Sequence, residues 1–113
     1  MLENLDYTHI GKNSYLNGDF IFSHHTILSG HMEGQITATK NASLKIEMSA
    51  SVKGKMKGYN LEIYGEFEGE IESLGTVKIF PTAQVNATIK AQHIEVLPGA
   101  RVNMTAHTQA AIN

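Results

Sequence analysis

The sequence repeats one pattern about every seventeen residues, in which apolar residues alternate with polar ones and a glycine or another small residue closes the run. The clearest copies are LKIEMSASVKGKM (44–56), VKIFPTAQVNATI (77–89) and IEVLPGARVNMTA (94–106). Shorter copies are YLNGDFIF (15–22), TILSGHMEGQI (26–36) and NLEIYGEFEGEI (60–71). A fixed period of this length indicates a solenoid, in which each copy forms one turn, or rung, and packs only on its neighbours.

Alternation with a period of two is the geometry of a β-strand, because residues two apart share one face of the pleat. In 44–56 the series expected to point inward is Leu44, Ile46, Met48, Ala50, Val52, Gly54 and Met56. Such a run is too long for one ordinary strand, so we expect bends at Ala50 and Gly54. Two other copies carry Pro81 and Pro98 at the position of Met48, and proline, which has no N–H to donate, belongs at a corner. The pattern predicts an all-β fold of stacked parallel strands with about six rungs.

The outward residues predict which copies lie on one another. Aligning the apolar starts of four copies places four charged residues of alternating sign in one column: Lys45, Glu62, Lys78 and Glu95. Stacking Gly54 on Gly69 likewise sets Lys53, Lys55 and Lys57 beside Glu68, Glu70 and Glu72. A slipped rung would bring like charges together, so this register is favoured. The acidic run is therefore interpreted as a solvated face paired with lysines rather than as a cation site.

Composition excludes several classes of protein. The 113 residues suffice for one domain, no apolar run approaches the length of a membrane span, and the N-terminal residues do not resemble a secretory signal. The chain has no cysteine and a formal net charge of −2, so it offers neither disulfides nor a basic surface for nucleic acid. We expect a cytoplasmic protein that does not bind nucleic acid.

Catalytic and metal-binding patterns are weak. His24, His25 and His31 are close in sequence, but no cysteine or nearby carboxylate completes a ligand set, so we interpret them as surface histidines. The serines lack the strand-to-helix elbow of a nucleophile, and the glycines lie inside alternating strands instead of preceding a helix. We predict no catalytic residue, no metal site and no cofactor.

The ordered repeats resemble the bactofilin family of polymer-forming bacterial cytoskeletal proteins. The resemblance rests on HIGKNSYLNGDF (9–20), SGHMEGQI (29–36), YGEFEGEI (64–71) and the closing IEVLPGARVNMTA (94–106). It implies a right-handed, single-stranded parallel β-helix over 9–106, with short tails at 1–8 and 107–113. It also implies end-to-end filaments formed without nucleotide, as a scaffold for cell-shape, cell-wall or surface-appendage machinery. Cell-wall enzymes and other scaffold proteins are the partners that it suggests.

The resemblance does not settle membrane attachment. Many members of the family carry longer tails and an N-terminal membrane-targeting segment, whereas few residues precede the repeats here. We therefore do not expect membrane attachment, and the inner face of the cell membrane remains the alternative to the open cytoplasm.

The terminal copies are the candidate self-association sites. Solenoids usually end in atypical polar repeats that cover the last rung, yet 94–106 is as regular as the interior copies. We predict a homopolymer that joins through apolar residues of the first and last rungs: Leu16, Phe20, Phe22, Ile94, Val96, Val102 and Met104.

Two alternatives remain open. One is a β-helix that serves as an adaptor or binding module and does not polymerise. The other is an acyltransferase of the left-handed β-helix class, but its aliphatic residue at every sixth position is not the pattern of this sequence.

Overall fold

The computed structural model describes the backbone of residues 7–39 and 42–108, with side chains over 8–39 and 42–103. The described residues form twelve β-strands and no helix. The odd-numbered strands are β1 (Tyr7–Ile10), β3 (His25–Leu28), β5 (Ser43–Ile46), β7 (Asn60–Ile63), β9 (Thr76–Ile79) and β11 (His93–Val96). The even-numbered strands are β2 (Tyr15–Phe22), β4 (His31–Ala38), β6 (Ser51–Gly58), β8 (Glu66–Ser73), β10 (Gln84–Ala91) and β12 (Arg101–Thr108).

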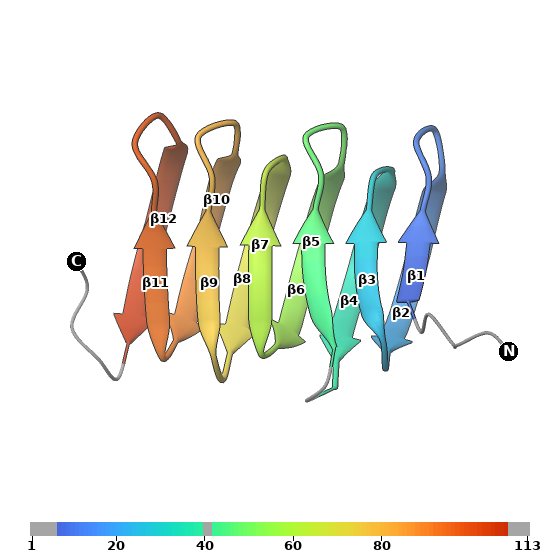
Figure 1. Ribbon diagram of the computed structural model, residues 1–113, viewed down its shortest axis with the longest axis horizontal. Helices are drawn as coiled ribbons and strands as arrows, with labels where there is room; N and C mark the ends of the chain where they lie inside the picture. The colour runs from blue at the N-terminus through green and yellow to red at the C-terminus, as the bar shows by residue number, and fades with distance from the viewer. Residues whose placement is uncertain (1–6, 40–41, 109–113) are drawn as a thin grey trace, which may run out of the picture.

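The strands form two parallel sheets, one odd-numbered in the order β1-β3-β5-β7-β9-β11 and one even-numbered in the order β12-β10-β8-β6-β4-β2. One odd-numbered strand and the even-numbered strand that follows it make one rung, so the chain coils through six rungs. Figure 1 shows the odd-numbered strands in front running upward and the even-numbered strands behind running downward, while the chain advances from right to left. This sense of coiling is right-handed, and the predicted parallel β-helix is confirmed.

Tight corners join each odd-numbered strand to its partner and continue the hydrogen-bonded ladder. The N–H of Glu47 donates to the Leu28 carbonyl at 2.9 Å, and the N–H of Tyr64 donates to the Ile46 carbonyl at 2.7 Å. Pro81 and Pro98 both lie in these corners, as expected from their missing donor. The inward placement of Met48 was wrong. It lies in the turn between β5 and β6 and is 69% exposed, because the turn interrupts the alternation.

The core is a set of apolar columns between the two sheets. Leu44, Leu61 and Val77 stack in register along the odd-numbered sheet and are almost completely buried. On the even-numbered sheet Val52, Phe67 and Val85 form the matching column. Burying an aliphatic or aromatic side chain contributes roughly 1.5–3 kcal/mol, so these columns account for most of the stabilisation of the coil.

The predicted charge register is confirmed. Lys45, Glu62, Lys78 and Glu95 are successive Cα partners, and Lys53, Lys55 and Lys57 pair with Glu68, Glu70 and Glu72. Within the second set the described ion pair joins Lys55 to Glu70, with 3.8 Å between Nζ and Oε1. In the first set Lys45 forms its ion pair within its own rung, 3.8 Å from the carboxylate of Glu47. Gly54 has a positive φ of 126°, and β6 continues through it from Ser51 to Gly58. Gly54 is exposed, so its inward placement was wrong.

Candidate assembly surfaces

The first and last rungs are the places where the ladder stops. β1 and β11 end the odd-numbered sheet, and β2 and β12 end the even-numbered sheet. Each of these strands pairs with a described strand on one side only. A strand edge of this kind presents backbone N–H and C=O groups that a further strand can use.

At the last rung the core column is uncovered. Val96 is 38% exposed, whereas its register partner Ile79, one rung earlier, is fully buried. Val102 is half-buried, although Val85 in the same column is buried. Ile94 is still buried, at 6% exposed. No described rung follows, and part of the apolar surface of Val96 and Val102 is exposed at this end.

The fourth residue predicted for this end, Met104, pairs through its backbone with Ala87 in β12. Its side chain lies outside the part of the structure that is described.

At the first rung the apolar residues are larger. Leu16, Phe20 and Phe22 are half-buried, whereas their register partners Met32, Ile36 and Ala38 are buried. The rings of Phe20 and Phe22 lie 6.3 Å apart and almost parallel, at 4°. The structure therefore places all the described residues of the predicted set on the two terminal rungs, in two separate groups. Their role in self-association stays a prediction.

Three of the histidines contact residues of the next or preceding rung. Nε2 of His9 is 3.3 Å from the Ser29 hydroxyl oxygen, and Nδ1 of His25 is 2.8 Å from that of Ser43. The His31 ring lies 6.1 Å from the Tyr15 ring. Over the described ranges no three histidine, aspartate or glutamate side chains are grouped to hold a metal ion.

A shallow groove of about 490 Å³ crosses the outer face of β6, β8, β10 and β12. Lys53, Glu68, Asn86 and Asn103 lie in it at one register position of successive rungs. Charges of both signs and neutral amides share the groove. This mixture does not select one class of ligand.

An aromatic stack on the odd-numbered side was not foreseen from the sequence. The rings of Tyr64 and Phe80 lie 4.0 Å apart at 11°, in the corners after β7 and β9. The ammonium groups of Lys45 and Lys78 lie over them, at 5.2 Å and 5.4 Å from the Tyr64 and Phe80 ring centres. The signal available in the sequence was that Tyr64 and Phe80 each follow an inward isoleucine at the same repeat position.

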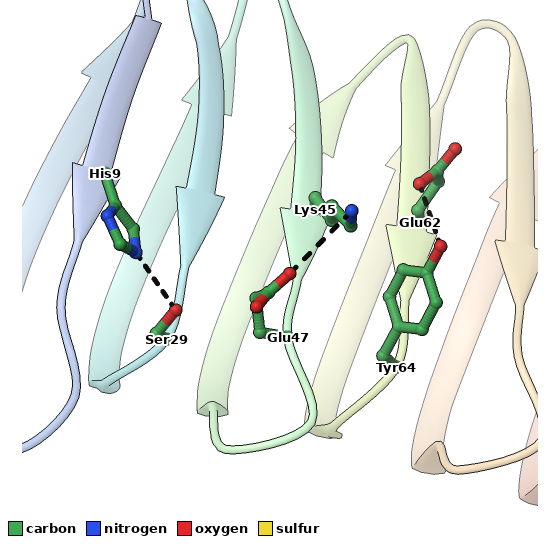
Figure 2. A network of polar contacts seen from close by, with 6 residues as sticks. All are labelled: His9, Ser29, Lys45, Glu47, Glu62 and Tyr64. Atoms are coloured by element: carbon green, nitrogen blue, oxygen red, sulfur yellow. Dashed lines mark hydrogen bonds and ion pairs between the residues drawn. The ribbon is translucent and has the colours of Figure 1, made fainter.

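The hydroxyl of Tyr64 donates to the Glu62 carboxylate at 3.4 Å, and Figure 2 shows this contact beside the Lys45–Glu47 ion pair on the same side of the coil. Burial raises the pKa of Tyr64 above its ordinary value of 10.0, and the negative charge of Glu62 raises it further. Tyr64 is thus a neutral hydrogen-bond donor at physiological pH.

Comparison with known proteins agrees with the fold. Residues 8–107 match the family model described as "Bactofilin: Polymer-forming cytoskeletal". No match was found among curated proteins or among solved structures. In the described part of the chain, no helix has the length and apolar character needed to span a membrane.

Proposed function

This chain belongs to the bactofilin family of polymer-forming cytoskeletal proteins, and we propose that it assembles end to end into filaments through its two terminal rungs. The observation that carries the proposal is the exposure gradient within one core column. Ile79 is fully buried, and its partner Val96 on the last rung is 38% exposed. A second copy that docks there would bury Val96 as an interior rung buries Ile79.

The free energy for docking comes from the fold itself. In a head-to-tail arrangement the edges of β11 and β12 meet those of β1 and β2 of the next copy, so the backbone ladder continues. Val96 then stacks on Ile10, and Val102 stacks on Leu16. Each apolar side chain that becomes covered contributes up to roughly 1.5–3 kcal/mol, so no nucleotide is needed to drive assembly.

A filament of this kind is a scaffold rather than an enzyme, as expected for a member of a structural family. We propose that it acts in the cytoplasm and supports cell-shape, cell-wall or surface-appendage machinery. Cell-wall enzymes and other scaffold proteins are the proposed partners.

The test uses a charge on the last rung. Val96→Lys and Val102→Lys should each give small species by light scattering and no filaments by electron microscopy, because a buried lysine opposes docking. Both variants should keep the β-rich circular dichroism of the parent, since neither side chain is fully buried in the single chain. The matched control is Ser51→Lys, a half-buried mid-coil position, which should still form filaments.

Two results would contradict the proposal. If the unmodified protein stays monomeric at high concentration, the adaptor interpretation replaces it. If the terminal variants polymerise as well as Ser51→Lys does, filaments form through another surface.

A further inference from the structure

The outer face of the odd-numbered sheet carries a column of alternating charge. Lys45, Glu62, Lys78 and Glu95 occupy one register position on β5, β7, β9 and β11, so the sign changes at every rung, about every 4.8 Å. Their side chains point away from the core and are at least partly exposed. In Figure 1 no other described element lies in front of this sheet. The column is therefore accessible from the side of the coil.

The aromatic stack lies next to the middle of this column. Tyr64 follows Glu62 by two residues and Phe80 follows Lys78 by two, so the ring pair sits level with the central two charges. Both rings are half-buried, and the lysine ammonium groups over them help to hold them in place. The face thus has an ordered aromatic centre beside a charged column.

This arrangement is self-complementary under one symmetry operation. A two-fold axis parallel to the strands, between the rungs of Glu62 and Lys78, reverses the coil axis and leaves the strand direction unchanged. The column then faces itself in reverse, with Lys45 opposite Glu95 and Glu62 opposite Lys78 of the other copy. The aromatic pair also faces its own equivalent. A parallel copy in the same register would instead place like charges opposite one another.

We propose that this face binds the same face of a second copy, side by side and with the coil axes antiparallel. This isologous contact is separate from the end-to-end docking proposed above and does not require it. Within one chain the alternating column holds the rungs in register. Between two chains the same column selects the orientation of a two-fold-symmetric contact, because such a contact places opposite charges opposite each other only when the axes are reversed. A parallel copy shifted by one rung would also pair opposite charges, but that contact is not two-fold symmetric.

A single pair of faces is small. In this arrangement β5, β7, β9 and β11 of the two copies overlap. Four strands of four residues cover roughly 14 by 13 Å, well below the roughly 800 Å² per partner of a stable interface. Two isolated chains should therefore associate weakly. In a filament the same face recurs in every subunit, so many weak contacts act together and filaments are expected to bundle.

The test is chemical crosslinking of the full chain, which contains no cysteine of its own. Facing sheets lie about 10 Å apart, too far for a disulfide, so a bismaleimide with a spacer of about 10 Å is appropriate. Lys45→Cys and Glu95→Cys proteins are mixed, each in a Val102→Lys background that opposes end-to-end docking. The mixture should give a crosslinked heterodimer, whereas Lys45→Cys alone should give little dimer, because residues 45 of the two copies lie three rungs out of line.

The matched control is a mixture of Lys53→Cys and Asn103→Cys, which lie on the same two rungs but on the even-numbered sheet. The proposed pair should crosslink roughly fivefold more than this control in low salt, and the excess should disappear near 1 M salt, where the screening length is about 3 Å. Equal yields for the two mixtures would overturn the proposal. A dimer of Lys45→Cys alone that matches or exceeds the heterodimer would overturn the antiparallel orientation and indicate parallel packing. Neither result depends on whether filaments form.

Discussion

The first four rungs and the last two use different backbones at the same position of the repeat. β2, β4, β6 and β8 each contain a glycine with positive φ, between 126° and 140°, and these glycines are in register: Gly18, Gly34, Gly54 and Gly69. β10 and β12 carry Ala87 and Met104 there, and neither has a positive φ. Gly54 is exposed, whereas Ala87 is only 8% exposed and belongs to the core. One repeat position thus holds a glycine with positive φ in β2, β4, β6 and β8 and a buried alanine in β10.

Steric contact between neighbouring rungs explains the glycine region. A Cβ atom built on Gly54 would overlap the carbonyl oxygen of Gly34, and one built on Gly69 would overlap that of Gly54. Gly34, Gly54 and Gly69 therefore let their rungs approach the preceding rung closely. Where Ala87 follows Gly69, the backbone takes a negative φ and turns the methyl group inward, and β10 alternates without interruption from Gln84 to Ala91. The comparison teaches that alternation predicts which face of a strand is buried. The backbone conformation at this repeat position depends on whether the residue is glycine.

The same two regions differ in the polar contacts that align their rungs. In the glycine region three lysines of β6 lie opposite three glutamates of β8. Farther along, the column that contains Lys53 and Glu68 continues with Asn86 and Asn103, which are uncharged. On the even-numbered sheet, salt should therefore affect the register of the first region more than that of the second.

The largest effect expected from this comparison is that of Gly54→Ala. An alanine at a φ of 126° is strained, and its methyl group meets the Gly34 carbonyl, so the free energy of unfolding should fall by about 1–3 kcal/mol. Urea denaturation followed by circular dichroism measures the change.

The reciprocal variant Ala87→Gly is the control for that experiment. It removes one buried methyl group and adds backbone freedom, so it should cost less, about 0.5–1 kcal/mol. If Gly54→Ala costs no more than Ala87→Gly, the glycine column is not what permits the close approach of the rungs.

A smaller effect is expected from the charged register. Replacing Lys53, Lys55 and Lys57 together by glutamate places like charges opposite Glu68, Glu70 and Glu72, and should destabilise the chain by about 1 kcal/mol in low salt. Added salt should restore part of the loss, and changing the three glutamates of β8 to lysine in the same chain should restore more. Thermal unfolding at two salt concentrations checks this. A sixfold variant that is no more stable than the threefold one would contradict the register.

The smallest effect concerns Tyr64, at the boundary between the two regions. Because burial and the charge of Glu62 raise its pKa in the folded chain, Tyr64 favours folding below about pH 10, and this contribution is lost as the pH rises through the folded-state pKa. Glu62→Gln should move the Tyr64 pKa down toward 10.0. The difference between ultraviolet titrations with and without Tyr64→Phe isolates this one phenol. An unchanged pKa in Glu62→Gln would mean that the carboxylate does not contribute.

The residue pattern predicted which residues lie on the last rung, but not how exposed each of them is. The sequence placed Ile94 and Val96 on the last rung, because both follow the alternation of the strand. It did not distinguish them, yet Ile94 is 6% exposed and Val96 is 38% exposed. The difference is a property of the stacked coil, because the two residues follow the same alternation in the same strand.

The sequence by itself determined the solenoid, the inward and outward faces of its strands and the register of the rungs, because strand periodicity is local and a slipped register would separate apolar partners and join like charges. It did not determine the exposure of Met48, the stack of Tyr64 on Phe80 or the change of backbone between Gly69 and Ala87. Those features are tertiary, because each depends on contact between residues or rungs that only coiling brings together. The sequence pattern and the tertiary structure differ most at the turn residues. Alternation stops there, so the contacts of each side chain depend on the neighbouring rung.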